Sequence, residues 1–180
     1  MKYLRIPLER IGVLIGPHGE TKKLLESNAG VDLEVDSKLG EIIIDDRKAD
    51  NPVATMKLEN VIKAIGRGFS PENAMALFHD DADFFIFDLH EYVGKKESHL
   101  RRLRSRIIGK EGKTRRVLEE LTNSHISVYG HTIAVIADLE DMPIIKKAID
   151  MLLSGSKHAT VYRHVESQMK ALRLQNRLGF

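Results

Sequence analysis

The chain has 180 residues, of which 42% are hydrophobic and 30% charged, and its formal net charge at pH 7 is +2. This composition is typical of a globular protein with one medium-sized domain or two small ones. The absence of cysteine excludes disulfides, thiol catalysis and cysteine-based zinc sites, and fits a cytoplasmic protein. No apolar run approaches the roughly 18 residues of a membrane span, and the charged start of the chain is unlike a signal peptide, so we expect no membrane association.

The small net charge conceals a strong asymmetry along the chain. Residues 94–116 hold ten lysines and arginines against two acids, whereas residues 26–91 hold fifteen acids against six bases. Residues 157–180 add five bases and one acid. Such blocks predict a surface that faces a polyanion on an otherwise acidic body, but a solvated helix face with nearby counter-charges gives the same pattern.

The first half of the chain alternates between the periodicities of strands and helices. We expect strands over residues 2–8, 31–36 and 40–46 and helices over residues 9–16, 21–27 and 52–67. The second of these helices should turn Leu24 and Leu25 toward the core. Asn51 followed by Pro52 favours the start of the third helix, because proline suits the first helical position.

The second half repeats this order. We expect strands over residues 83–89, 125–129 and 132–137 and helices over residues 95–108, 113–122 and 141–153. Between the halves, Ser70-Pro71 marks a helix start, and the stretch HDDAD forms an acidic turn. After the second half, residues 159–178 predict a basic amphipathic helix, which we expect to pack on the second half through Tyr162, Val165, Met169 and Leu172.

A duplicated motif underlies the two halves. With an offset of 93 residues, IGPHGETKKLLE at residues 15–26 aligns without a gap with IGKEGKTRRVLE at residues 108–119. Both copies keep two glycines three positions apart, followed by a threonine and basic residues. Agreement over this length indicates a repeated unit of about 70 residues, and repeats are informative because they determine the whole fold.

The two glycines suit a turn that presents the start of a helix to a phosphate. Glycine allows a close approach of backbone, and the first N–H groups of a helix lack partners in the helix. The following Lys22 and Lys23, or Arg115 and Arg116, can hold further phosphates, while Ile15 or Ile108 can floor a groove for unstacked bases. A lone Gly-x-x-Gly is more often a plain helix connection. Two copies beside a basic segment favour nucleic-acid binding.

The two motifs resemble the Ile-Gly-x-x-Gly signature of the KH domain, and the β-α-α-β-β-α order is similar to the eukaryotic-type KH arrangement. The resemblance implies an α+β protein with two KH modules in tandem plus a C-terminal helix. We expect module one at residues 1–68, a spacer with a short helix at 69–83, module two at 84–155 and a basic helical tail at 156–180.

The tandem pair and the stretch TVYRHVE in the tail resemble the archaeal relatives of the Krr/Pno/Dim ribosome-assembly factors. This resemblance implies binding to single-stranded small-subunit rRNA near its 3′ end. It also implies two protein partners, a PIN-type endonuclease of the Nob kind and translation initiation factor two. Neither a cofactor nor a catalytic reaction is implied.

The predicted RNA-binding residues fall in the two loops and the helices around them. Copy two should bind more strongly, because its first helix is rich in arginine, whereas Pro17 removes one N–H donor from the first loop. Glu111 departs from the basic or polar pattern of such loops. The predicted residues are Gly16, Pro17, His18, Gly19, Lys22, Lys23, Arg101, Arg102, Arg104, Arg106, Ile108, Gly109, Lys110, Glu111, Gly112, Lys113, Arg115 and Arg116.

Two other functions compete with RNA binding. A protein-interaction scaffold with degenerate KH folds would explain Pro17, Glu111 and the acidic half. A metal-dependent nuclease would use the cluster His79 to Asp83, although an acidic linker explains that cluster more simply. The stretch GKEGKT is not a phosphate-binding P-loop, because Ile107 stands where that motif needs its first glycine.

Overall fold

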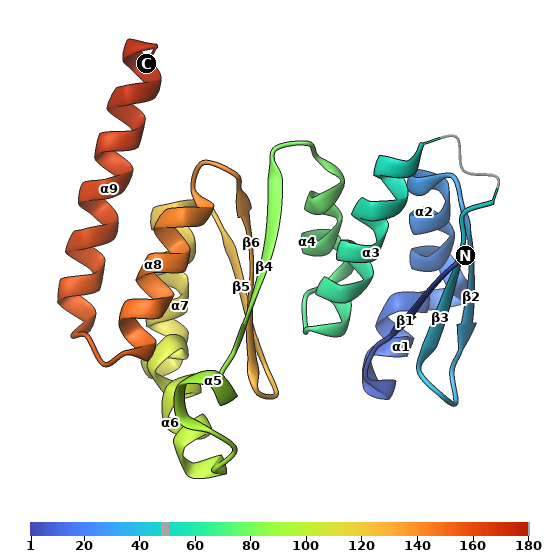
Figure 1. The fold of residues 1–180 in the computed structure, drawn as a ribbon, viewed down its shortest axis with the longest axis horizontal. Helices are drawn as coiled ribbons and strands as arrows, with labels where there is room; N and C mark the ends of the chain where they lie inside the picture. Colours follow the sequence, from blue (N-terminus) through green and yellow to red (C-terminus); the bar gives the residue numbers. More distant parts are fainter. Residues whose placement is uncertain (48–50, 180) are drawn as a thin grey trace. The chain divides into compact units, whose positions relative to one another are not determined.

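The computed structural model describes residues 1–47 and 51–179, and these residues divide into two compact units, Met1–Phe84 and Phe85–Phe180. Figure 1 shows that both units combine one sheet with packed helices. The expected mixed α+β class is therefore confirmed. Among the described residues, no helix is both long and apolar enough to cross a bilayer.

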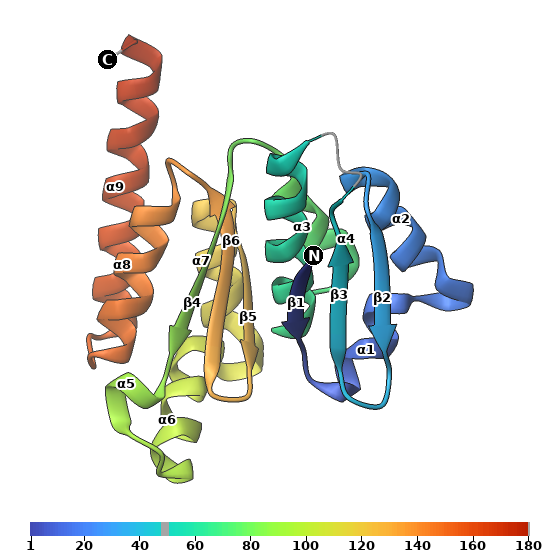
Figure 2. The same ribbon diagram turned by 45° about the vertical axis from the view of Figure 1, so that its right-hand side comes forward.

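The first unit follows the predicted order of strand, two helices, two strands and a helix. Its three strands form an antiparallel sheet in the order β1-β3-β2, and helices cover one face of it (Figure 2). A short helix and a 3₁₀ turn follow. The elements are β1 (Lys2–Arg5), α1 (Leu8–Ile15), the 3₁₀ turn η1 (Pro17–Gly19), α2 (Glu20–Ala29), β2 (Asp32–Asp36), β3 (Glu41–Asp45), α3 (Pro52–Gly66), α4 (Pro71–Met75) and η2 (Ala76–Phe78).

The core of the first unit lies between the sheet and these helices. Alternate residues of β3, Ile42 and Ile44, are fully buried, as are Leu14 of α1 and Leu25 of α2. The expectation that Leu24 also points inward is wrong, since its side chain is 47% exposed. A helix as short as α2 turns only a narrow stripe toward the sheet, and Leu25 occupies it.

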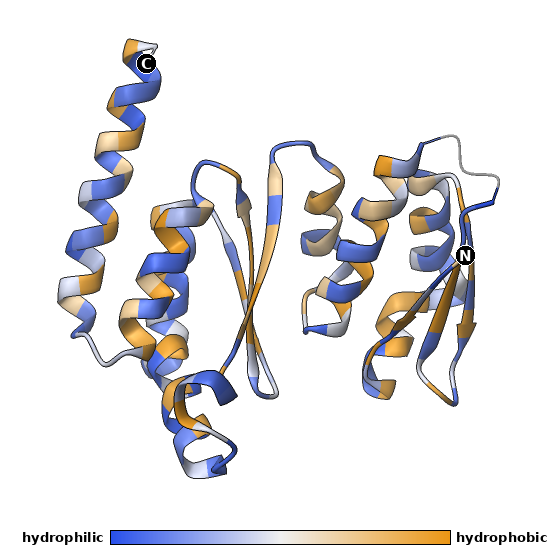
Figure 3. Ribbon diagram, in the orientation of Figure 1, coloured by the Kyte–Doolittle hydropathy of each residue, from blue (hydrophilic) through white to orange (hydrophobic). Residues whose placement is uncertain are grey.

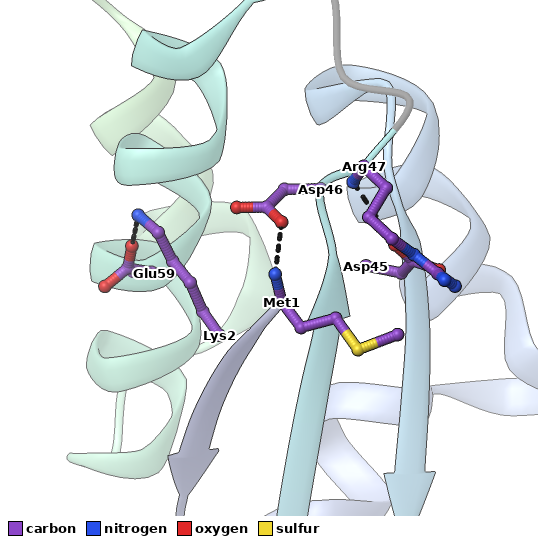
Figure 4. A network of polar contacts seen from close by, with 6 residues as sticks. All are labelled: Met1, Lys2, Asp45, Asp46, Arg47 and Glu59. Carbon is purple, nitrogen blue, oxygen red and sulfur yellow. Dashed lines mark hydrogen bonds and ion pairs between the residues drawn. The ribbon is translucent and has the colours of Figure 1, made fainter.

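Polar contacts fasten the strand ends of the first unit (Figure 4). The N-terminal ammonium of Met1 contacts Asp46 Oδ1 at 2.6 Å, and Lys2 pairs with Glu59 of α3. Arg47 binds Asp45 through two nitrogens, at 2.9 and 2.6 Å. These ion pairs hold the pKa of both Asp45 and Asp46 below the usual value of an aspartate.

The second unit contains a sheet of order β4-β6-β5. One short helix, α5, was not predicted, and α6 begins two residues later than expected because Lys96 has extended backbone angles. The elements are β4 (Ala82–Asp88), α5 (His90–Val93), α6 (Glu97–Ile108), the 3₁₀ turn η3 (Lys110–Gly112), α7 (Lys113–Thr122), β5 (His125–Tyr129), β6 (Thr132–Asp138), α8 (Met142–Leu153) and α9 (His158–Leu178).

The tail helix α9 packs against α7 and α8 of the second unit, as expected. Val161, Val165 and Met169 are buried and join the core of this unit. Tyr162 packs against the edge of the core, whereas Leu174 and Leu178 near the end of the helix are exposed. The mixed colours along α9 in Figure 3 reflect this one-sided packing.

The sequence repeat extends to a shared hydrogen bond. Glu26 in α2 accepts the backbone N–H of Leu33 at 2.8 Å, and Glu119 in α7 accepts that of Ile126 at 2.8 Å. Each glutamate thus ties the helix that follows its pair of glycines to the next strand. Both glutamates of the aligned motif therefore have the same local role.

Candidate nucleic-acid interface

The two Gly-x-x-Gly loops have nearly the same backbone. Gly16 and Gly109 have φ/ψ of 72°/174° and 74°/176°, and Gly19 and Gly112 have 76°/16° and 77°/11°. All four glycines therefore adopt positive φ, which side-chain-bearing residues rarely adopt. The third loop residue, His18 or Glu111, is also left-handed, with φ of 51° and 54°.

The first glycine of each loop is required for a second reason. A Cβ added to Gly109 would lie 2.2 Å from Thr114 Oγ1, and one added to Gly16 would lie 2.2 Å from Thr21 Oγ1. The threonine two residues after the second glycine thus packs into the space that the missing side chain leaves. By contrast, a Cβ on Gly112 would meet open space. The conserved spacing between glycine and threonine in the two copies follows from this contact.

Both loops lead directly into a helix, whose first N–H group, that of Glu20 or Lys113, donates to the Pro17 or Lys110 carbonyl of the loop. In the part of the chain that the structure describes, no side chain caps the N-terminus of α2 at Gly19 or of α7 at Gly112. N–H groups at a helix start carry partial positive charge and bind anions well. The loop-to-helix junction therefore suits a phosphate in both units, although Pro17 supplies no N–H in the first loop.

Several of the predicted basic residues surround the second loop and are exposed. Lys110 lies in the loop itself, Lys113 and Arg116 follow in α7, and Arg101 and Arg102 lie on α6. Arg116 donates to the Glu111 carbonyl at 3.1 Å, which places its guanidinium over the loop. Together these residues form a positively charged surface around the junction.

Two arginines of α6 have internal partners instead. Arg106 donates through Nε to the Leu152 carbonyl at 2.8 Å and also to the Ser156 carbonyl, so it joins α6 to the end of α8. Arg104 bonds to the Gly130 carbonyl at 2.7 Å and pairs with Glu97. Because their hydrogen bonds are used inside the unit, we assign both a positioning role.

The first unit uses a related arginine. Arg10 of α1 donates to the carbonyl of Ile65, in the last turn of α3, at 2.7 Å and to that of Phe69, just after α3, at 2.6 Å. Around its loop, His18 and Lys23 are exposed, while Lys22 pairs with Glu26 at 3.2 Å. The first loop therefore has fewer exposed cations around it than the second.

The apolar residue before each loop keeps part of its surface accessible. Ile15 and Ile108 are half-buried, and each lies in the last turn of the helix that precedes the loop. A half-buried isoleucine beside the loop-to-helix junction can provide an apolar contact for an unstacked base whose phosphate binds at that junction. The predicted contact of Ile108 with a base stays a prediction.

The acidic stretch from His79 to Asp83 is not arranged as a metal centre. Asp80 pairs with Lys57, and this ammonium lowers the pKa of the Asp80 carboxyl. A different group, Asp88, His90 and His131, brings its ligand atoms within 4.8 Å of one another. Its imidazoles stack with centroids 4.3 Å apart and planes 21° apart, so their lone pairs do not converge on one ion.

The sequence prediction missed one residue beside the loop. His158, the first residue of α9, approaches the Arg106 carbonyl with its Nε2 at 3.0 Å. Its position fifty residues from the motif explains the omission, since only the packing of α9 brings it to α6. The stretch TVYRHVE, which begins two residues later, was the available signal.

A mixed α+β unit with a left-handed Gly-x-x-Gly junction defines a KH-type nucleic-acid-binding module. The family model for the second KH domain of Pno1 proteins, described as a eukaryotic-type KH domain (KH-domain type I), matches residues 83–170. A KH domain-containing protein of Methanocaldococcus jannaschii is 40% identical over 173 residues, covering 96% of this chain and 76% of that protein. The chain therefore belongs to the family of archaeal KH-domain proteins related to the Pno1 and Dim2 ribosome-assembly factors.

Two further relatives indicate the range of this family. The pre-rRNA-processing protein pno1 of Aspergillus fumigatus is 32% identical over 122 residues, which cover 65% of this chain but only 48% of the fungal protein. A crystal structure from Pyrococcus horikoshii, described as an a/eIF2alpha-aDim2p-rRNA complex, contains a chain with a TM-score of 0.87 and 39% identity. The match covers 94% of each chain.

Proposed function

We propose that this protein binds single-stranded RNA and holds small-subunit rRNA near its 3′ end during assembly or maturation of the ribosomal subunit in the cytoplasm. The observation that carries this proposal is the junction at Gly109–Gly112. There, a left-handed loop with exposed Lys110 leads into the uncapped start of α7, and exposed Arg101 and Arg102 lie on the preceding helix.

The mechanism follows from these groups. The α7 start and Lys110 hold backbone phosphates, Arg115 and Arg116 of α7 neutralise further charge, and Ile108 contacts a base turned toward the protein. Gly109 and Gly112 allow the RNA backbone to approach. The protein performs no chemistry in this mechanism, and it needs no cofactor.

We also propose that both units are KH modules, at residues 1–68 and 84–155, joined by the spacer 69–83 and followed by the tail 156–180. The matching strand and helix orders, the matching loop angles and the shared glutamate hydrogen bond support this division. In this arrangement the first loop, with Pro17, His18 and fewer exposed cations, binds RNA weakly, and the acidic first unit contacts proteins.

The proposed protein partners are a PIN-type endonuclease and translation initiation factor two. The second partner is supported by the Pyrococcus horikoshii complex, whose description includes a/eIF2alpha and rRNA beside a chain similar to this one. The acidic first unit is the surface that we assign to these contacts.

The test is fluorescence anisotropy with a short single-stranded RNA that matches a small-subunit rRNA 3′ end. The same sequence as a duplex is the control. We expect tighter binding of the single strand, with an affinity that falls as salt rises, because phosphate contacts release counterions. Affinity no better than about 10⁻⁴ M at physiological salt, the upper end of non-specific binding, would refute the proposal.

A further inference from the structure

A hollow of about 430 Å³ opens beside the Gly109–Gly112 loop. Its wall includes Arg102 and Ser105 of α6, Lys110 of the loop and His158 of the tail helix. The guanidinium of Arg102 and the ammonium of Lys110 make the hollow cationic. It lies next to the Gly109–Gly112 junction that is proposed to hold RNA phosphates, called the phosphate clamp below, so the same RNA strand can reach it.

The tail helix is fastened to this hollow at two points. His158 Nε2 lies 3.0 Å from the Arg106 carbonyl, and the Tyr162 hydroxyl donates to Thr114 Oγ1 at 3.3 Å. Thr114 is the residue that packs into the space at Gly109. Arg106 also binds the Ser156 carbonyl, two residues before α9. The start of α9 is therefore held against the loop by direct hydrogen bonds.

The contact with Arg106 also determines the tautomer of the neutral imidazole. A carbonyl oxygen only accepts, so the Nε2 of His158 carries the hydrogen in the bond to Arg106. In the neutral ring, Nδ1 is then left as an acceptor. A hydroxyl group is the natural partner of such an acceptor, and the ribose 2′-hydroxyl is the donor that distinguishes RNA from DNA.

We propose that the hollow holds one nucleotide of the RNA next to the phosphate clamp, and that His158 accepts the hydrogen bond of its 2′-hydroxyl. Arg102 and Lys110 hold the phosphate of this nucleotide, and the tail helix forms the third wall of the RNA site. The proposal rests on the proposed function, and it adds discrimination between RNA and DNA to that function.

The test compares single-stranded RNA with the same sequence built on deoxyribose. Wild type should prefer RNA by about fivefold, the size of one hydrogen bond. His158→Ala should remove this preference by weakening RNA binding alone. His164→Ala, the same change on the same helix but outside the hollow, should behave as wild type. Lys110→Asp should weaken binding of both nucleic acids.

A second measurement starts from wild-type protein and is then repeated with the variant. Single 2′-deoxy substitutions are placed one at a time along the RNA, and one position should carry most of the loss. The 2′-deoxy substitution at that nucleotide should not weaken binding of the RNA to His158→Ala. A scan without a sensitive position would overturn the proposal, as would equal losses of RNA and DNA binding in His158→Ala.

The two proposals fail in different ways. If wild type does not bind single-stranded RNA, or Lys110→Asp has no effect, the proposed function is wrong. If Lys110→Asp weakens binding but His158→Ala binds RNA and DNA as wild type does, only the role of His158 is overturned.

Discussion

The loops at Gly16–Gly19 and Gly109–Gly112 differ far less in backbone than in surroundings. The third residue has φ/ψ of 51°/21° in one loop and 54°/29° in the other. After each loop a basic residue pairs with the glutamate of the motif, Lys22 with Glu26 and Arg115 with Glu119. The first loop has Pro17 and Glu20 where the second has exposed Lys110 and Lys113, and the start of the tail helix lies beside the second loop alone among the described residues. The same turn can therefore serve two different surfaces, and its backbone alone does not determine the ligand.

The similarity of the two loop backbones is tested by substitutions of the first glycine of each loop, which should have the largest effect on the free energy of unfolding. Gly109→Ala and Gly16→Ala each combine positive φ with a Cβ that would lie 2.2 Å from a threonine oxygen. We expect each to lower the free energy of unfolding by about 3 kcal/mol in urea titrations. Gly112→Ala has positive φ but open space, and should cost about 1 kcal/mol. Equal costs at positions 109 and 112 would show that the threonine contact is unimportant.

The next effect concerns Arg10, which joins α1 to the end of α3, and Arg106, which joins α6 to the end of α8. Arg106→Ala and Arg10→Ala each leave two backbone carbonyls without their charged donor. We expect each to lower the free energy of unfolding by about 2 kcal/mol. Arg101→Ala, on the exposed face of α6, is the matched control and should change stability by less than about 0.5 kcal/mol. A cost at Arg101 as large as at Arg106 would contradict the positioning role.

Acid should affect the first unit through Asp45 and Asp46. Their ion pairs lower the pKa of both carboxyls in the folded unit. The ion pairs therefore stabilise the folded unit above about pH 3.9, the pKa of an aspartate in an unfolded chain. This stabilisation is lost as the pH falls through the lower pKa of the folded unit. We expect the melting temperature of Asp46→Asn to fall less than that of wild type between about pH 4 and pH 2. Parallel curves for the two proteins would contradict this role of Asp46.

Alkali should affect the second unit through Tyr92, with a smaller effect. Burial of the phenol, with a hydrogen bond to Asp150, raises the pKa of Tyr92 to about 12. The neutral phenol is thus favoured in the folded unit, and its contribution is present below about pH 10 and lost as the pH rises toward 12. Tyr92→Phe should lose less stability than wild type over this range, as measured by thermal unfolding. A steeper loss would exclude Tyr92 as the cause.

Apart from the four-residue helix α5, the sequence was sufficient for the order of helices and strands, because each of the longer elements shows its own periodicity. The duplicated motif located both loops, since the first glycine and the threonine that it contacts are only five positions apart. Leu24 was placed wrongly because periodicity over ten residues does not separate two adjacent leucines. The partners of Arg104 and Arg106 and the position of His158 depend on residues 26 to 52 positions away, and no local pattern contains that information.

The central claim is that the second loop holds single-stranded RNA much more strongly than the first. The most direct test is fluorescence anisotropy with an rRNA 3′-end oligonucleotide, comparing Lys110→Asp in the second loop with His18→Asp in the first. We expect Lys110→Asp to weaken binding by about 1–3 kcal/mol and His18→Asp to change it by less than about 0.5 kcal/mol. Equal losses would show that both loops bind RNA, and loss in His18→Asp alone would reverse the assignment.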